Sequence, residues 1–370
     1  MKKLSVYIHI PFCVSKCAYC DFLSFAGRGE LHAAYADALA SEIVASKTEL
    51  ADYAAETVYF GGGTPTALPA SALVRLLDAL RGTCKVLPDA EITSEANPET
   101  ANPQNLSELR AAGFNRLSLG IQSFDDNLLK RVNRAHSAET ARDAYAAACE
   151  AGFENIGIDL MFSIPGQTTD NFERTLRQAA DLSPEHISCY GLTVEPGSSL
   201  AGDGYEPDEE ADRAMYALAR EILPENGYEH YEISNFAIPG HRSRHNTAYW
   251  NGQDYRGFGL GAHSLINGAR FHAGTCLESY IASNGASPRQ NVEFLRESDM
   301  RAEFMILGLR LLDGINCEDF SRKFDKNIYR EYGAQIKELT AQGLLEASGN
   351  RIRLTPRGID LSNQVFAKFI

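Results

Sequence analysis

The sequence predicts an α/β fold, a partial (β/α)6 barrel followed by a small C-terminal helical, winged-helix-like domain. Two observations lead to this prediction. Between residues 3 and 195, six short apolar segments typical of strands alternate with segments of helical period, as in a parallel sheet covered by helices. From about residue 300 the pattern changes to helices followed by two short strands. Eight strand–helix units would close a full barrel, so six predict an open one that admits a large ligand.

Each strand–helix unit is placed by its hydrophobic period. The strands are predicted at residues 4–10, 57–60, 91–96, 115–119, 155–161 and 186–190. The helices between them are predicted at residues 30–48, 69–81, 103–112, 137–151 and 168–181. Gly113 and Gly152 follow two of these helices, where a residue with a left-handed backbone commonly ends a helix.

The remaining residues belong to an extension of the barrel and to the second domain. Residues 196–290 are less periodic and rich in Gly, Asn, Tyr and His, and we expect them to extend the barrel. The predicted domains therefore span residues 1–295 and 296–370. In the second domain the predicted helices are 301–312, 329–341 and 358–369, and the predicted hairpin strands are 344–347 and 351–355.

Charge and hydropathy argue against several classes of function. The chain has 35 Lys and Arg against 49 Asp and Glu, a net charge of −14, which disfavours general affinity for nucleic acid or an anionic membrane. A DNA-binding wing is the alternative for residues 301–370, but their 11 basic and 9 acidic residues make a poor basic footprint. No apolar run reaches 18 residues, so no transmembrane segment is predicted.

The cysteines indicate a reducing compartment. Eight cysteines in 370 residues, three of them clustered, do not form the framework of a small disulfide-rich protein. The chain also starts directly with a strand pattern and lacks the pattern of a signal peptide. We therefore expect a cytoplasmic protein, with a peripheral position at the membrane as the alternative.

Cys13, Cys17 and Cys20 are the most informative residues of the chain. Three thiolates within eight residues are the ligand type that a [4Fe–4S] cluster takes. A cluster with only three protein thiolates keeps one iron open for a small ligand. The alternatives are a zinc site, which needs a fourth ligand such as His9 or Asp21, and three unrelated thiols.

Further motifs fall at the ends of the predicted strands. The cysteine loop follows the first strand, the glycine-rich segment 61–65 follows the second, and Glu95 ends the third. Gln122 follows the fourth strand, and Asp159 lies at the close of the fifth. Because function collects at the carboxyl ends of parallel strands, these positions predict one working site.

The residue types at these strand ends suit a small zwitterionic ligand with a ribose. The glycine segment removes side chains where backbone must approach a ligand, although a tight turn explains it equally well. Asp159 suits a ribose diol, and Arg134 suits an α-carboxylate through two charge-assisted hydrogen bonds. Taken singly, each of these polar residues has the alternative of a solvated strand end.

Longer segments of the chain resemble the oxygen-independent coproporphyrinogen III oxidase family of radical S-adenosylmethionine (SAM) proteins. The matching segments are Glu95 and residues 7–20, 61–66, 120–124, 132–134, 159–165 and 257–264. The likeness covers most of residues 3–300 and implies the radical SAM fold, a TIM-like partial barrel. It also implies that Cys13, Cys17 and Cys20 hold the cluster. The contacts that it implies for SAM are Tyr7, Tyr19, Gly62, Gly63, Thr64, Glu95, Gln122, Arg134 and Asp159.

Two departures from the decarboxylating members of that family bear on activity. Phe22 stands where those oxidases carry a fourth cysteine, and only 12 residues precede Cys13, where the oxidases carry a longer leader. Both missing features are associated with the oxidase reaction, so their absence counts against that reaction here.

A third feature resembles the HemW branch of the family, the heme chaperones. Residues 244–250 contain the motif His-Asn-x-x-Tyr-Trp, and residues 228–237 also match that branch. The resemblance implies heme bound by His245 as an axial ligand, with Tyr249 and Trp250 as its walls. The basic residues for its propionates would be His241, Arg242 and Arg244. The alternative is a hydrogen-bonded structural His245 beside a core Trp250.

The resemblance as a whole implies a heme chaperone that carries a [4Fe–4S] cluster and SAM. Such a protein transfers heme to recipient proteins, among them respiratory enzymes at the membrane. The alternative is an enzyme: an oxidase that decarboxylates coproporphyrinogen III to protoporphyrinogen IX, or another radical SAM enzyme that acts on heme. Catalytic residues are not assigned, and no nucleic acid is expected as a partner.

Overall fold

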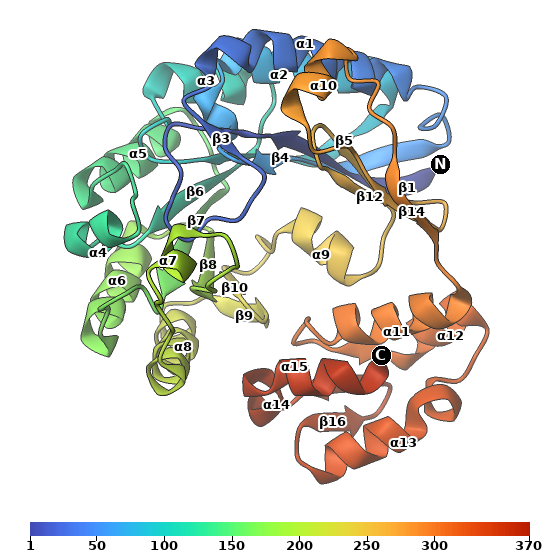
Figure 1. Cartoon of the computed structure of the whole chain (residues 1–370). Coiled ribbons are helices and arrows are strands. Elements are labelled where there is room, and N and C mark those ends of the chain that lie inside the picture. The colour runs from blue at the N-terminus through green and yellow to red at the C-terminus, as the bar shows by residue number, and fades with distance from the viewer.

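A twelve-stranded curved sheet forms the barrel, and the computed structural model describes it within residues 1–370. Six parallel strands make up its middle and follow one another in chain order. These strands are β1 (Lys2–Ile10), β4 (Tyr53–Gly62), β5 (Lys85–Ala96), β6 (Arg116–Gln122), β7 (Ile156–Phe162) and β8 (His186–Gly191). The predicted partial (β/α)6 barrel is confirmed (Figure 1).

Helices cover the outer face of this sheet (Figure 1). The five predicted helices are α1 (His32–Ala45), α2 (Ala70–Thr83), α3 (Pro103–Ala111), α5 (Ala138–Glu150) and α6 (Thr169–Leu182). Two further helices, α4 (Asp126–Arg131) and α8 (Glu209–Glu225), were not expected from the sequence. Gly113 and Gly152 have φ angles of 98° and 86°, the left-handed backbone expected after α3 and α5.

Residues beyond β8 extend the sheet at both ends, as the sequence indicates. At the β8 end the added strands are β10 (Asn235–Ala237) and β9 (Glu229–Glu232). At the β1 end they are β11 (Tyr255–Phe258), β12 (His263–Ile266), β13 (Ala269–His272) and β14 (Gln290–Phe294). Helix α9 (Arg244–Trp250) connects the two ends across the open side of the barrel (Figure 1).

The short elements of this part lie in its connections. They are β2 (Phe12–Cys13), β3 (Phe25–Ala26), the 3-10 helices η1 (Gly29–Leu31) and η2 (Pro65–Ala67), α7 (Ser199–Gly202) and α10 (Leu277–Ala282). Strands β2 and β3 pair in parallel and brace the cysteine loop from both sides.

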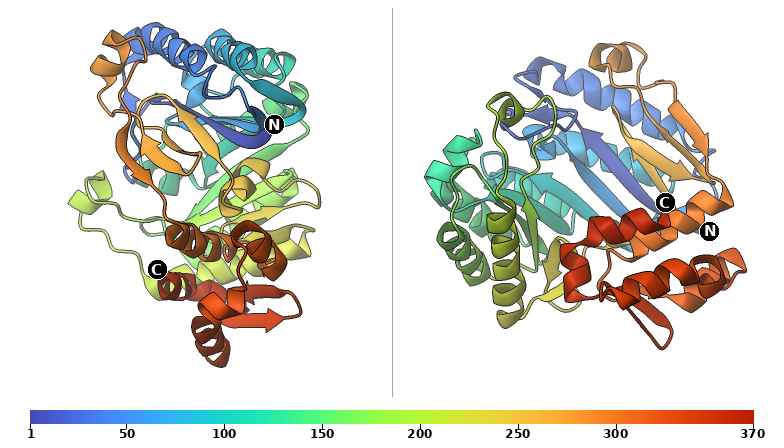
Figure 2. Two further views of the ribbon diagram at one scale, coloured as in Figure 1. Left: turned by 90° about the vertical axis from the view of Figure 1, so that its right-hand side faces the viewer. Right: turned by 60° about the horizontal axis from the view of Figure 1, so that its bottom comes forward.

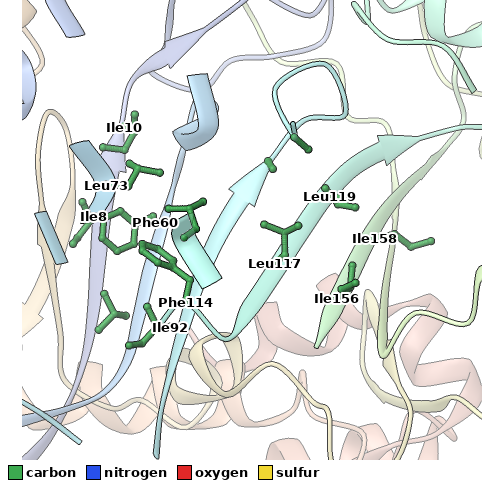
Figure 3. Close-up of a cluster of buried hydrophobic side chains, with 14 of the residues drawn as sticks. Ile8, Ile10, Phe60, Leu73, Ile92, Phe114, Leu117, Leu119, Ile156 and Ile158 are labelled. Atoms are coloured by element: carbon green, nitrogen blue, oxygen red, sulfur yellow. The ribbon is translucent and has the colours of Figure 1, made fainter. Parts of the chain in front are cut away.

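The main hydrophobic core lies between the sheet and its outer helices. It contains 61 buried residues, and every second strand residue contributes to it, because successive side chains of a strand point to opposite faces. Figure 3 shows this layer. Its labelled residues are Ile8, Ile10, Phe60, Leu73, Ile92, Phe114, Leu117, Leu119, Ile156 and Ile158.

The alternate positions of the same strands point into the barrel and are polar. Arg116 and Ser118 alternate with core leucines on β6, and His186 and Ser188 alternate with Ile187 on β8. Buried polar groups require partners. The inner face is therefore built for something other than packing.

Residues 297–370 form a second body with its own core of 17 buried residues. Its elements are α11 (Glu297–Gly308), β15 (Ile315–Asn316), α12 (Cys317–Phe324), α13 (Ile328–Ala341), β16 (Leu345–Ser348), β17 (Arg351–Leu354), α14 (Pro356–Asp360), α15 (Ser362–Phe366) and η3 (Ala367–Phe369). The hairpin is present and β15 joins it as a third strand. This body lies against the open side of the barrel, as Figure 2 shows.

The prediction of one helix over residues 358–369 is wrong. Helix α14 ends at Asp360, and Leu361 takes a non-helical backbone with φ −114° before α15 begins. Gly358 is pressed so closely on the carbonyl oxygen of Leu344 that an added Cβ would lie 1.9 Å from it. The chain turns after this contact, and a hydrophobic period alone does not reveal such a break.

Four side-chain ion pairs join the second body to the barrel, among them Arg242–Asp313 and Arg310–Glu232. Arg270 of β13 and Glu303 of α11 form a two-pronged pair with both distances at 2.8 Å. Arg220 of α8 pairs with Asp360 at 2.7 Å. Among all helices of the structure, none combines the length and the apolar character that a membrane crossing requires.

Candidate functional site

One cavity of about 610 Å³ occupies the inside of the barrel. The cysteine loop, strands β4 to β8, helix α9 and the C-terminal body all contribute to its lining. Twelve of the eighteen residues that the sequence assigns to the cluster, SAM or heme line it. They are Cys13, Cys17, Tyr19, Cys20, Gly62, Gly63, Thr64, Glu95, Gln122, Arg134, Asp159 and Trp250.

The three cysteines lie at one end of this cavity as free, half-buried thiols. The Thr64 hydroxyl donates a hydrogen bond to Cys13 Sγ at 3.6 Å, and Arg134 Nη1 donates one to Cys17 Sγ at 3.4 Å. Burial raises the pKa of the Cys13 and Cys20 thiols. A metal that binds here would release their protons, because the thiolate is the ligand form.

These observations fit an iron–sulfur cluster. Three thiols with polar donors to sulfur are the ligands that such clusters take and the hydrogen bonds that tune them. No three His, Cys, Asp or Glu side chains are placed to hold a single metal ion; the three thiols border a larger space. The role of Cys13, Cys17 and Cys20 as cluster ligands stays a prediction.

The glycine segment brings backbone against the cysteine loop. Gly62 has φ 114°, and a Cβ there would lie 2.5 Å from the ring of His9. A Cβ on Gly63 would lie 2.7 Å from the carbonyl oxygen of Phe12 and 3.0 Å from Cys13 Sγ. Both positions therefore require glycine for close approach, and the side-chain-free surface faces the cavity.

Glu95 lies next to this segment, and its carboxyl has a raised pKa. Its Oε1 accepts a hydrogen bond from the Tyr59 hydroxyl at 2.8 Å, and its Oε2 accepts one from the Gly62 N–H at 3.2 Å. Burial, with the charge of Asp159, raises the pKa of Glu95 to about 7 despite these bonds. The carboxyl is thus ready to bind a cationic amino group, which would favour its charged form.

Gln122 ends β6, and the side chain of Arg134 reaches the same place from the loop after α4, where it donates to the carbonyl oxygen of Gly120. Arg134 donates to Asn97 Oδ1 at 2.9 Å, whereas its buried Nε has no partner. Gln122 has a left-handed φ of 68°, and its Oε1 accepts a hydrogen bond from the Tyr190 hydroxyl at 2.8 Å. Both side chains line the cavity, with donors left for a ligand.

Asp159 lies deeper than the sequence indicates. It is the fourth of the seven residues of β7, not its last, because the strand continues to Phe162. Ser118 Oγ donates to its Oδ2 at 3.5 Å, and burial is the main cause that raises the pKa of Asp159. Its side chain still reaches the cavity.

Six of the expected residues do not line the cavity: Tyr7, His241, Arg242, Arg244, His245 and Tyr249. The Tyr7 hydroxyl lies 3.1 Å from His9 Nδ1, and its ring stacks behind Tyr59. Tyr7 therefore supports the cavity wall from outside.

His245 differs from the environment expected of an axial heme ligand. It is buried, its Nδ1 lies 2.8 Å from Thr57 Oγ1, and its Nε2 lies 3.0 Å from the Tyr249 hydroxyl. The ring also stacks on Tyr59 with centroids 4.9 Å apart. Neither nitrogen is free for iron in this conformation, so the structure matches the alternative of a hydrogen-bonded structural histidine.

The basic residues near His245 are also engaged elsewhere. Arg242 pairs with Glu229 and Asp313, and Arg244 pairs with Asp89 at 3.9 Å. Neither lines the cavity, and neither does His241. Trp250 alone of the motif residues named for heme faces the cavity.

Several polar lining residues were not expected from the sequence. They are Tyr59, Asn97, Arg116, Ser118, His186, Ser188, Tyr190, Glu232, Asn235, Asn246 and Arg310. A signal for many of them exists: polar residues at every second position of a buried strand, as in Arg116–Ser118 and His186–Ser188–Tyr190. The second body contributes Arg310, which no local pattern reveals.

Comparisons with known proteins agree with this architecture. The model of the Radical SAM superfamily matches residues 7–179, and that of the HemN C-terminal domain matches residues 295–361. The solved structure of coproporphyrinogen III oxidase (HemN) from Escherichia coli, a radical SAM enzyme, superposes with a TM-score of 0.87 at 26% identity. That superposition covers 100% of this chain and 90% of the oxidase.

Curated relatives extend over the full length of the chain. The heme chaperone HemW of Lactococcus lactis is 36% identical over 100% of this chain and 98% of its own length. The heme chaperones HemW of Bacillus subtilis and Escherichia coli are 36% and 33% identical, each over 99% of this chain. The chain therefore belongs to the HemW family of heme chaperones within the radical SAM superfamily.

Proposed function

We propose that this protein binds heme and hands it to recipient proteins, on a scaffold that also holds a [4Fe–4S] cluster and SAM. The observation that supports this most strongly is the end-to-end similarity to heme chaperones of several bacteria. Phe22, where the decarboxylating oxidases carry a fourth cysteine, supports the same choice. Thiolate ligands need reducing conditions, so we place the protein in the cytoplasm, with recipients that include membrane-bound respiratory enzymes.

The residues at the cysteine end of the cavity have separate roles in this proposal. Cys13, Cys17 and Cys20 would hold the cluster, which when bound offers an open iron and an electron to SAM. The glycine segment and Glu95 would receive the amino group of SAM. Arg134 would orient its carboxylate through the Nε that has no partner in the protein.

Asp159 would accept hydrogen bonds from the ribose, because its carboxyl reaches the cavity from the middle of β7. Gln122 would stay fixed by the hydrogen bond from Tyr190 and present its amide N–H to the ligand.

Heme would rest against Trp250. Of the three residues predicted to contact heme, His245, Tyr249 and Trp250, only Trp250 borders the cavity. Ligation by His245 would require this side chain to give up its contact with Thr57 or Tyr249. We therefore assign His245 a supporting role, in which it holds α9 through Thr57 and Tyr249, and leave the iron ligand to another group or to the recipient.

The second candidate is the oxidase reaction on coproporphyrinogen III. It is favoured by the TM-score of 0.87 against the Escherichia coli oxidase over the whole chain. The same fold serves both activities, and fold alone does not decide function.

Two assays on the cluster-reconstituted protein test the proposal. In the first, the protein is titrated with heme and then mixed with a heme-free respiratory cytochrome, whose absorbance reports transfer. In the second, it is given coproporphyrinogen III, SAM and a reductant, and the products are examined for protoporphyrin. We expect heme transfer without decarboxylation. Protoporphyrin formation without heme binding would reverse the assignment.

A further inference from the structure

The end of the cavity away from the cysteines contains buried N–H groups that have no partner in the protein. Four side chains that line this end each have a buried nitrogen without a hydrogen-bond acceptor. They are Arg116 (Nε), His186 (Nδ1), Trp250 (Nε1) and Arg310 (Nε). Unsatisfied buried polar groups are rare in native proteins, and several in one cavity require an explanation.

Arg116 is the most unusual of these residues. It is 2% exposed and is among the largest fully buried side chains of the protein. It forms no ion pair and no side-chain hydrogen bond within the protein, although Glu95 and Asp159 share the inner face. A buried guanidinium without a partner is costly, so a bound anion is the natural compensation.

His186 adds a donor beside Arg116. A Cβ built on Gly157 would lie 3.1 Å from Arg116 Nη2 and 3.4 Å from His186 Nδ1, so the two groups flank the same glycine. The Ser243 N–H donates to the Tyr231 oxygen, which leaves the Tyr231 proton for His186 Nε2 at 2.8 Å. The remaining proton of the neutral ring is then on Nδ1, which lines the cavity as a donor.

Trp250 and Arg310 continue this row of donors into the C-terminal body. The Arg310 guanidinium lies over the Trp250 ring, 4.3 Å from its centroid, and 3.9 Å from Glu232 Oε2. Arg310 thus has a carboxylate close by, whereas Arg116 interacts with Glu95 and Asp159 only through space, without a hydrogen bond or an ion pair.

We propose that this inner end of the cavity is a binding chamber for the carboxylate of an organic ligand, with Arg116 as its anchor. The planar guanidinium fork matches a carboxylate. A doubly charged phosphate would be disfavoured by the three carboxyl groups, Glu95, Asp159 and Glu232, that share the cavity. The carboxylate comes either from a heme propionate, which rests on the proposed function, or from a free small acid.

The test compares Arg116→Met with a matched buried arginine. Arg256, on β11, is also buried but pairs with Glu42 at 3.3 Å and Glu49 at 3.2 Å. Cluster-reconstituted Arg256→Met should lose thermal stability, because two carboxylates lose their partner. Arg116→Met should be as stable as the unaltered protein or more so, because it removes an unpaired charge.

Three probes then identify the ligand: heme, heme dimethyl ester and succinate. If a propionate enters the chamber, Arg116→Met should weaken heme binding roughly 10- to 150-fold and leave binding of the ester unchanged. If a free acid enters, heme binding stays unchanged, whereas succinate raises the melting temperature of the unaltered protein but not that of Arg116→Met. Failure of the unaltered protein to bind heme would count against the proposed function, while the succinate measurement would still test the chamber.

The inference is overturned if Arg116→Met leaves heme binding unchanged and succinate protects neither protein. It is also overturned if Arg116→Met loses affinity for heme and for the ester by the same factor. A third contrary outcome is that Arg116→Met is as unstable as Arg256→Met and binds all three probes as the unaltered protein does. Should Arg116→Met not fold, Trp250→Phe replaces it, because it keeps a ring and removes only an N–H donor. Unchanged affinity of Trp250→Phe for both heme and succinate would then refute the chamber.

Discussion

At the scale of single residues, burial shifts the pKa values of carboxyl groups on the inner face of the barrel. Glu95 lines the cavity on the inner face of the barrel, and burial raises its pKa from 4.5 to about 7. Below pH 4.5 its protonated form is present in both folded and unfolded chains. As the pH rises toward 7 the unfolded chain loses its proton first, so this group makes folding less favourable.

We therefore predict that Glu95→Gln becomes more stable relative to the unaltered protein as pH rises. In cluster-free protein the difference in the free energy of unfolding should grow by about 2 to 3 kcal/mol between roughly pH 5 and pH 8. Urea unfolding at several pH values measures it. Glu108→Gln, on the exposed side of α3, is the control and should leave the profile flat. A flat difference for Glu95→Gln would mean that its carboxyl is already ionised at pH 5.

A second prediction concerns the three cavity thiols. Replacing Cys13, Cys17 and Cys20 together with Ala should remove the iron and the brown absorbance of reconstituted protein, because these thiolates are the expected ligands. Iron content and the electron paramagnetic signal of the reduced sample measure it. The matched control replaces Cys149 and Cys276, which are exposed and outside the cavity, and should keep full iron content. Full loading of the triple variant would contradict the cluster site.

The residues that could be predicted from the sequence are those whose signal is local. The cysteine spacing and the glycine segment each lie within a few positions. The alternation of polar residues on β6 marks Arg116 as facing inward, but it does not reveal that the guanidinium has no partner. Arg310 could not be predicted in this way, because it reaches the cavity from another body. Only the folded chain brings such residues together.

At the scale of elements, helix α9 is fixed across the barrel by its N-terminal turn. The N–H groups of Arg244 and His245 both donate to the carboxylate of Glu91, at 3.0 Å each. The ring of His245 joins α9 to Thr57 on β4. Burial, aided by the Arg116 charge, lowers the pKa of His245 to about 3, so this ring stays neutral.

We predict that His245→Ala lowers stability and leaves the heme spectrum unchanged. The loss of two hydrogen bonds and a stacked ring should cost about 2 to 4 kcal/mol, measured by chemical denaturation. The Soret band of the folded, heme-loaded fraction should keep its position. His241→Ala, a change in the loop before α9, serves as control and should affect neither quantity. A shifted Soret band with stability unchanged would establish axial ligation instead.

The hydrophobic period predicted the positions of helices and strands that have one buried face. It could not predict the structural role of α9, because Thr57 and His245 are 188 positions apart in the sequence. The break at Leu361 was missed for a related reason: the contact between Gly358 and Leu344 that precedes it is tertiary. The sequence predicts elements well and contacts between distant elements poorly.

At the scale of the whole molecule, the C-terminal body has a hydrophobic core of its own and also contributes to the lining of the cavity. Arg310, two residues after the end of α11, lies over the ring of Trp250 in α9. Lys323 of α12 makes a second link to the barrel, because its Nζ donates to the carbonyl oxygen of Gly252 at 3.2 Å. Any movement of this body would therefore open the inner end of the cavity. The Arg270–Glu303 pair joins this body to β13 through two hydrogen bonds, and both side chains are two-thirds covered or more.

Reversal of this pair tests the attachment. Arg270→Glu and Glu303→Arg should each place like charges together and loosen the body, and the double variant should restore the attraction. A loss of about 1 kcal/mol corresponds to roughly fivefold faster chymotrypsin cleavage between β14 and α11 in either single variant. Cleavage in the double variant should return toward the rate of the unaltered protein.

Arg177→Glu is the control for added negative charge, because Arg177 pairs with Glu173 within α6 alone. It should leave the cleavage rate unchanged. If both single variants are cleaved at the original rate, the hydrophobic contacts hold the body without help from this pair. If the singles are cleaved faster and the double variant is not rescued, general destabilisation is the cause. Rescue by the double variant alone assigns the effect to the contact between β13 and α11, and so to the position of Arg310 over the cavity.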